Sequence, residues 1–220
     1  MYTLIGRSSV LALALACFFA LTSPRSAQAK KYPEPSVYPI SWELNFKHGS
    51  PQRIVVALSG TSTPSAYWYM TYTLTNKTGN DQTFIPSFEL VTADGKRYRG
   101  DFAIRGEVFD AIKKRENNQL LEPAERIGGT LRQGDDQAKD GVVIWKEPPS
   151  SMRSFSIFVG GLSGEHVTLK DDDGKPITDS EGQPVILRKT LELVYQARGG
   201  SGPNINPSQL DEKPQRWVMR

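Results

Sequence analysis

The sequence contains a single cysteine, Cys17, and two histidines, His48 and His166. Because Cys17 lies in an apolar N-terminal stretch, the rest of the chain can form no disulfide and offers no thiolate to a metal ion or a substrate. Each histidine lacks a second His, Cys or Glu at metal-ligand spacing, and we expect both to be surface residues. Nucleophile-elbow, P-loop and dinucleotide-binding patterns are also absent, which removes the common hydrolase and nucleotide-binding signatures.

The N-terminal stretch has the three parts of a signal peptide. Arg7 supplies the positive charge, residues 10–21 are apolar, and Ala27-Gln28-Ala29 places small residues at a cleavage site. The pattern predicts that residues 1–29 are removed after Ala29 and that the protein is periplasmic or secreted. The apolar run is shorter than the roughly 20 residues of a membrane-spanning helix. Lipidation at Cys17 is the alternative, but the residue three positions earlier is Ala14 and not the usual leucine.

The basic character of the full chain comes mainly from this leader. Removing Arg7 and Arg25 lowers the net charge from +3 to +1 and leaves 191 of the 220 residues. A length of this size fits one domain. With so small a net charge, the sequence gives no indication of nucleic-acid binding, and we expect no membrane span after cleavage.

Short alternating segments separated by Gly, Pro, Asn and Asp dominate the remainder. About ten candidate strands and one helix at residues 106–118 predict an all-β, immunoglobulin-like antiparallel β-sandwich with one short helical insertion. We place an extended lead-in at residues 30–39, the single domain at residues 40–198, and a flexible C-terminal tail with an apolar end at residues 199–220. The helix is expected to cap one end of the sandwich.

Residues 66–96 carry the densest aromatic and β-branched run, and they predict a central hairpin with a polar turn at residues 76–81. Alternation places Tyr67 and Tyr69 on a face half open to water. The residues that it places toward the core are Trp68, Met70, Tyr72 and Leu74. Pro86 predicts an edge or a bulge in the second strand.

The TNKTG turn and the FELVTADGK segment within residues 72–96, followed by Leu121-Glu122-Pro123 and a Gly-containing segment, resemble exported, uncharacterised β-sandwich proteins of planctomycete-type bacteria. A more distant resemblance is to bacterial immunoglobulin-like domains of extracellular proteins. The resemblance spans residues 40–197. It implies export and a non-catalytic role, and it supplies no functional residues.

Three candidate sites emerge. Tyr67 and Tyr69, with Tyr98 nearby, form a possible platform for a sugar or a peptide, although cross-strand aromatics commonly serve only to stabilise a sheet. Trp217 lies in an apolar C-terminal segment that docks either on a partner or on its own domain. A calcium site is the third candidate, with ligands from two acidic turns that could equally be ordinary hairpin turns: Asp171, Asp173, Asp179 and Glu181.

Two further motifs have plain structural interpretations. Arg99-Gly100-Asp101 resembles an integrin-binding tripeptide but consists of common turn residues. Lys113-Lys114-Arg115 could bind an acidic partner, but such a run is typical of a solvated helix face.

These features lead to the expectation of a non-catalytic binding or structural module of the cell envelope that contacts an envelope protein or an extracellular polymer. The alternative is a carbohydrate-active or other hydrolytic enzyme whose carboxylates come from distant parts of the chain.

Overall fold

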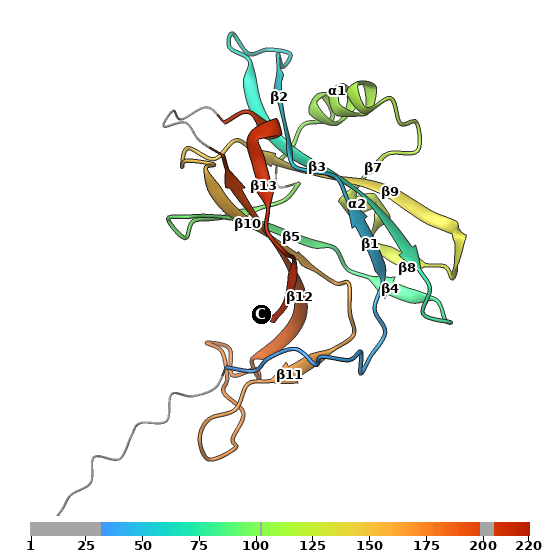
Figure 1. Cartoon of the computed structure of the whole chain (residues 1–220), viewed down its shortest axis with the longest axis vertical. Coiled ribbons are helices and arrows are strands. Elements are labelled where there is room, and N and C mark those ends of the chain that lie inside the picture. The colour runs from blue at the N-terminus through green and yellow to red at the C-terminus, as the bar shows by residue number, and fades with distance from the viewer. Residues whose placement is uncertain (1–31, 102, 199–204) are drawn as a thin grey trace, which may run out of the picture. The chain divides into compact units, whose positions relative to one another are not determined.

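Two β-sheets packed face to face form the body of the protein (Figure 1). The computed structural model describes residues 32–101, 103–198 and 205–220. Residues 33–220 form one compact unit. The predicted signal peptide, its cleavage site and Cys17 lie outside the described residues. Among those that are described, no helix is long and apolar enough to cross a membrane.

The first sheet has five strands built around a long central strand, which pairs on one side with two short strands and on the other with the longest strand of the protein. Its members are β1 (Asn45–His48), β2 (Gln52–Val56), β3 (Ser65–Asn76), β7 (Glu122–Pro123) and β9 (Gly134–Lys146). All pairs are antiparallel except β7 with β9.

The second sheet has seven strands, all paired antiparallel, in the order β11-β12-β10-β5-β6, with β13 and β14 also paired to β12. The strands are β5 (Ser87–Thr92), β6 (Arg97–Arg99), β10 (Ser154–Gly160), β11 (His166–Thr168), β12 (Ile186–Ala197), β13 (Leu210–Glu212) and β14 (Arg216–Met219). A separate two-stranded sheet joins β4 (Gln82–Phe84) to β8 (Gly129–Leu131).

The main core lies between the two large sheets. Trp68 and Tyr72 on β3 meet Phe155 and Phe88 of the opposite sheet, with ring centroids 5.9 Å and 5.1 Å apart respectively. These contacts confirm the predicted all-β sandwich and the assignment of this face of β3 to the core. Burial of such aromatic pairs supplies much of the driving force for the fold.

A second apolar core lies on the outer side of the five-stranded sheet, under the helix α1 (Gly106–Glu116). Val108 and Ile112 of α1 are fully buried there. The helix therefore covers a face of the sheet (Figure 1), and the expectation that it caps one end of the sandwich is wrong. A second helix of four residues, α2 (Ala124–Ile127), was not predicted.

The predicted central hairpin is wrong. β3 and β5 belong to different sheets, and the chain passes between them through β4, which pairs with β8. The buried Asn76 directs this path, because its amide donates to the carbonyl oxygens of both Asn80 and Leu131 at 2.8 Å. Pro86, which has no N–H to donate, separates β4 from β5, as its position predicts.

The sequence also predicts a polar loop at residues 134–141, one strand at residues 125–133, and pairing between strands at residues 40–47 and 52–59, and all three predictions fail. Residues 134–141 are polar but belong to β9, because β3 pairs with residues 139–141 and, after a break in register, with Gly134. Residues 125–133 form α2 and β8 in place of one strand. β1 and β2 do not pair with each other; both run along the same edge of β3, with the Gly49 N–H bonded to the Thr71 carbonyl between them.

The C-terminal segment is ordered into the sheet within residues 205–220. β13 and β14 both pair with β12, so the prediction of a flexible tail is wrong for this part, and docking on the parent domain is confirmed. Trp217 packs half-buried against the main core, and the Lys189 ammonium lies 5.2 Å from its ring centroid. Trp217 is thus engaged inside its own domain.

Candidate functional site

The outer face of the five-stranded sheet changes character along β3. Tyr67 and Tyr69 are 5% and 0% exposed under α1, and the Tyr69 hydroxyl donates to Glu116 Oε1 at 2.6 Å. Burial raises the pKa of Tyr69, and the bond to Glu116 raises it further. The predicted tyrosine platform is therefore wrong, because a helix covers this face. Tyr98, on β6 of the other sheet, packs toward the main core and therefore does not lie beside Tyr67 and Tyr69.

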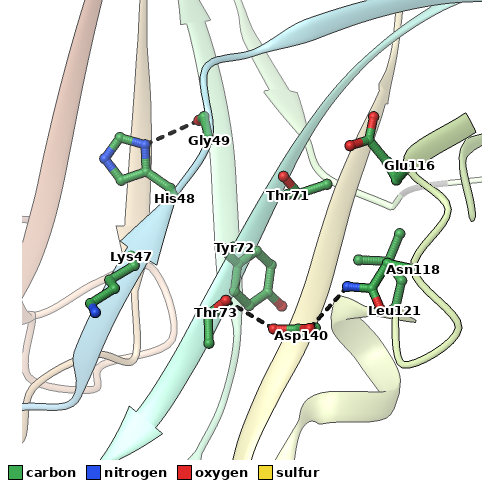
Figure 2. A pocket seen from close by; sticks show the side chains of 10 residues that line it. All are labelled: Lys47, His48, Gly49, Thr71, Tyr72, Thr73, Glu116, Asn118, Leu121 and Asp140. Atoms are coloured by element: carbon green, nitrogen blue, oxygen red, sulfur yellow. Dashed lines mark hydrogen bonds between the residues drawn. The ribbon is translucent and has the colours of Figure 1, made fainter.

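A polar pocket of about 300 Å³ opens where the helix ends (Figure 2). Beyond Tyr69 the outward residues of β3 are Thr71 and Thr73, which are only partly buried. The wall comes from the last turn of α1 and the loop after it, and the remaining sides come from β1 and β9. The lining residues are Lys47, His48, Gly49, Thr71, Tyr72, Thr73, Glu116, Asn118, Leu121 and Asp140.

Two carboxylates from distant positions, Glu116 and Asp140, meet at this pocket. Asp140 accepts hydrogen bonds from Thr73 Oγ1 at 2.8 Å and from Asn118 Nδ2 at 2.9 Å, so both of its oxygens are engaged (Figure 2). Glu116 accepts from the buried Tyr69 hydroxyl. The sequence offered no signal for this pair, because the two acids converge only through the pairing of β3 with β9.

His48 is more buried than predicted, with its side chain 10% exposed. Its Nδ1 lies 3.2 Å from the Gly49 carbonyl oxygen and 3.5 Å from the Tyr195 hydroxyl, and its Nε2 lies 3.5 Å from Glu212 Oε1. The expectation of a surface histidine is wrong here, since β13 brings Glu212 to it from the end of the sequence. His166 is exposed, as predicted.

Within the described residues, no apolar core covers the outer face of the seven-stranded sheet, which we call the open face. The buried apolar residues of the described chain form two clusters, and neither includes the outward side chains of this sheet. On β10, Phe155, Ile157 and Val159 are buried toward the core, while Ser156 and Phe158 alternate with them on the open side.

A groove of about 660 Å³ lies on this open face, between the sheet and the chain near Trp42 and Ile85. Ile85 is 73% exposed at its edge. Gly161 allows the close approach of the two sides: it has φ +84°, and a Cβ there would lie 2.3 Å from the Ile85 carbonyl oxygen. The groove is lined by Trp42, Thr83, Ile85, Ser87, Glu89, Phe158, Gly160, Gly161, Ser163, Gly164, Arg188, Thr190 and Arg220.

Arginines dominate the charge of the open face. Arg220 lies over the Phe158 ring, with Cζ 3.8 Å from the centroid, and pairs with Glu89. Arg216 Nε lies 2.6 Å from Glu192 Oε2. The outward positions of the sheet's strands hold five arginines (Arg97, Arg99, Arg188, Arg216 and Arg220) and three acids (Glu89, Glu192 and Asp211).

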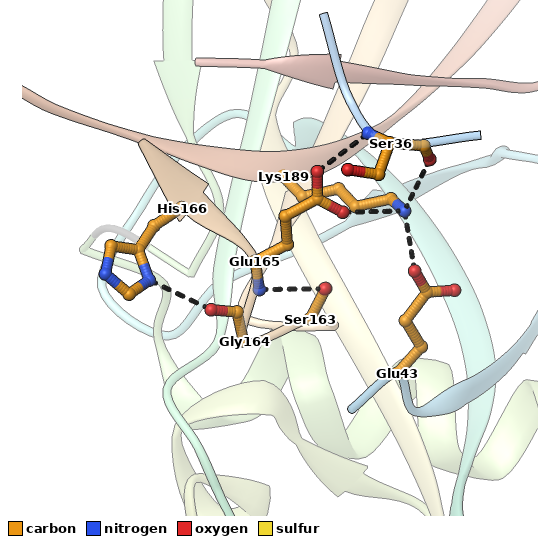
Figure 3. Close-up of polar contacts among 7 residues, drawn as sticks. All are labelled: Ser36, Glu43, Ser163, Gly164, Glu165, His166 and Lys189. Carbon is orange, nitrogen blue, oxygen red and sulfur yellow. Dashed lines mark hydrogen bonds and ion pairs between the residues drawn. The ribbon is translucent and has the colours of Figure 1, made fainter. Parts of the chain in front are cut away.

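A buried ion cluster centres on Lys189, which is 3% exposed (Figure 3). Its ammonium lies 2.6 Å from Glu43 Oε1 and 3.1 Å from Glu165 Oε2, and Glu165 Oε1 accepts from the Ser36 N–H at 2.7 Å. Burial opposes the charged forms, but the partners prevail: the pKa of Lys189 is raised and that of Glu165 is lowered. The cluster fastens residue 36 of the lead-in to β12.

Arg99-Gly100-Asp101 connects the two sheets. The Gly100 N–H donates to the Phe88 carbonyl, and Asp101 exchanges bonds with Ile144, accepting from its N–H at 2.8 Å. Burial raises the pKa of Asp101 to about 7. The tripeptide is thus occupied in joining β6 to β9.

The acidic turns do not form the expected calcium site. Asp171 Oδ1 accepts from the N–H groups of Asp173 and Lys175, and Asp179 Oδ1 accepts from those of Glu181 and Gln183. Within the described residues, no three His, Cys, Asp or Glu side chains gather closely enough to hold a metal ion. The alternative of ordinary turns, each stabilised by its own aspartate, is the one that the geometry supports.

The basic run on α1 contacts its own domain in part. Lys113 Nζ donates to the Leu121 carbonyl at 3.1 Å and Arg115 donates to the Arg53 carbonyl at 2.7 Å, while Lys114 is exposed.

Comparison with known proteins gives little. No family model and no curated protein match the chain. Among solved structures, the 1.5 Å crystal structure of MPT63, a secreted protein from Mycobacterium tuberculosis, matches with a TM-score of 0.35 and 19% identity. The match covers 58% of this chain and 95% of MPT63. At this TM-score it carries no argument about what the chain does.

Proposed function

We propose that this protein is exported and serves as a non-catalytic binding module of the cell envelope, with its ligand on the open face of the seven-stranded sheet. One observation carries the proposal: the five-stranded sheet has a helix packed on its outer face, whereas the seven-stranded sheet leaves its outer face open with a groove of about 660 Å³. Binding sites are concave, with apolar walls and a few placed polar groups, and the groove has this composition.

Two matched exposed residues allow a direct test. Ile85 is 73% exposed at the groove, and Leu120 is 76% exposed beside α1. A photo-crosslinking amino acid with an aliphatic diazirine, which reacts with protein and glycan alike, is introduced at each position in turn. After irradiation of intact cells, the adducts are identified by mass.

We expect an envelope component to be captured from position 85 and none from position 120. Capture at neither position, or the same adduct at both, would show that the open face is not the binding surface.

A second candidate function is hydrolysis at the polar pocket, favoured by the meeting of Glu116 and Asp140. Glycoside hydrolysis uses two carboxylates about 5–10 Å apart, one of them as a general acid. Against it, Asp140 already accepts two hydrogen bonds from neutral donors, which suits a structural role.

The two functions separate in an assay of the purified protein on a panel of glycosides. The binding proposal expects no turnover. If the protein does turn over a glycoside, and Glu116→Gln lowers the rate roughly a hundredfold or more, as for loss of a general acid or base, the hydrolase proposal would replace the binding proposal.

A further inference from the structure

Two arginines face each other at one end of the groove. Arg188 on β12 and Arg220 just after β14 exchange both backbone hydrogen bonds, at 2.7 Å and 3.0 Å. Residues paired in this way project to the same face of a sheet and lie about 5.5 Å apart at Cα. Like charges directly opposite each other destabilise a sheet unless an opposite charge is near.

Only one of the two is neutralised within the described ion pairs. Arg220 is fixed between Glu89 and the ring of Phe158. Arg188 is exposed at the groove and has no acidic partner among those pairs. A carboxylate bound at Arg188 would take two parallel hydrogen bonds from its guanidinium and would offset the like-charge pair.

The position of the groove favours a glycan over a peptide. It lies on the face of the sheet, where the strand backbones are already paired, and extended peptides usually add to an unpaired edge. The groove instead offers the exposed side-chain hydroxyls of Thr83 and Ser87 and the half-buried indole of Trp42. The hydroxyls of Ser163 and Thr190 are buried and bonded within the domain. Hydroxyls and an aromatic side chain are groups suited to sugar rings.

Charge also sets the orientation of the ligand. A neighbouring hollow shares Ile85, Ser87 and Glu89 with the groove but contains Asp101 and Glu125. Arg99 also lines that hollow, so its charges are mixed, whereas Arg188 at the β12–β14 end of the groove has no acidic partner among the described ion pairs. The negative group of the ligand therefore belongs at the β12–β14 end.

We infer that the groove binds an acidic polysaccharide, with a uronate carboxylate held by Arg188 and the adjoining sugar rings against the indole of Trp42 and the hydroxyls of Thr83 and Ser87. This inference rests on the proposed function, because it names the ligand class of the same face.

The test measures binding of the purified protein to polygalacturonate, with dextran as a neutral glycan and polyglutamate as an acidic peptide. Arg188→Gln removes the inferred anchor. Arg126→Gln is the matched control, because Arg126 is an exposed arginine of α2 beside α1. We expect polygalacturonate alone to bind, with an affinity that falls in high salt and falls roughly tenfold in Arg188→Gln, as for loss of a charged hydrogen-bonding group. Arg126→Gln should bind as the unaltered protein does.

Equal binding of dextran would overturn the role of charge, and equal or tighter binding of polyglutamate would overturn the choice of a glycan. Equal losses in both variants would mean that general electrostatic attraction, and not Arg188, holds the polymer. Crosslinking from position 85 in the presence of excess polygalacturonate separates this inference from the proposed function. If the adduct still forms, the proposed function stands but its ligand is not an acidic polysaccharide. If no adduct forms even without polygalacturonate, the proposed function itself is wrong.

Discussion

The outer faces of the two sheets differ in what covers them. Under α1, the outward residues Tyr67, Tyr69, Val142 and Ile144 are 5% exposed or less. On the other sheet the outward residues of β10 are Ser156 and Phe158, which stay half-exposed. A strand buried on both faces reads as a continuous apolar run, and a strand with one wet face alternates. The continuous apolar run VVIW in β9 therefore belongs to the sheet that is covered on both faces, and the alternating SFSIFV in β10 belongs to the sheet with one open face.

The largest expected effect comes from a matched aromatic pair. Tyr69→Ala leaves a large cavity under α1 and deprives Glu116 of its donor, and it should lower the free energy of unfolding by about 3–5 kcal/mol. Phe158→Ala on the open face should cost about 1 kcal/mol, because its ring is only partly buried. Urea denaturation of both variants measures the two values. Equal losses would mean that the second face is as much a core as the first.

Adjacent residues of β12 sharpen the same contrast. Lys189→Met leaves Glu43 and Glu165 without their shared cation in a buried setting, and it should cost about 3 kcal/mol or more. Arg188→Gln, one residue away on the open face, should change stability by about 0.5 kcal/mol or less. Thermal or urea unfolding of the two variants measures both values. Equal losses of stability would contradict the assignment of Lys189 to the inner side of the sheet and Arg188 to the open face.

The free energy of unfolding should depend on pH through Asp101, which lies at the junction between the sheets. Because burial raises the pKa of Asp101 to about 7, above its value near 4 in an unfolded chain, the folded protein holds a proton that the unfolded chain releases. Its contribution to stability is complete below pH 4 and is lost as the pH rises to about 7. Asp101→Asn keeps an oxygen for the Ile144 N–H and should lose this slope in urea denaturation between pH 4 and 8. Asp110→Asn, on the exposed side of α1, serves as control and should keep it.

The smallest effect is expected at the acidic turns, which belong to neither face. Since each aspartate is engaged with its own backbone, adding calcium or a chelator should leave the melting temperature unchanged. A shift of several degrees that disappears in Asp171→Ala would restore the calcium site.

The alternation of apolar and polar residues and the position of proline predicted most strands and their core-facing residues. Alternation assigned Trp68, Met70 and their neighbours to the core and located most strands, because side-chain direction in a strand follows directly from sequence position. Pro86 marked a break for an equally local reason. The covering of Tyr67 and Tyr69 could not be read in this way, because it depends on where α1 packs.

The candidate sites depended still more on distant pairings. The pocket needs β3 beside β9 to bring Asp140 to Glu116, and the groove needs β14 beside β12 to bring Arg220 to Arg188. Nothing in the local sequence around these residues specifies the register of those pairs. The continuous apolar run at residues 142–145 was an available signal for the second core.

The pairing of sequence-distant segments also has a consequence for folding rate. His48 lies beside Glu212, and Ser36 is bonded to Glu165, so both ends of the described chain are needed to complete the sandwich. Proteins dominated by such separations fold slowly, in milliseconds to seconds, because loop closure must precede the contacts that reward it. A slowly folding chain stays unfolded for longer after synthesis, which is compatible with the export that we propose.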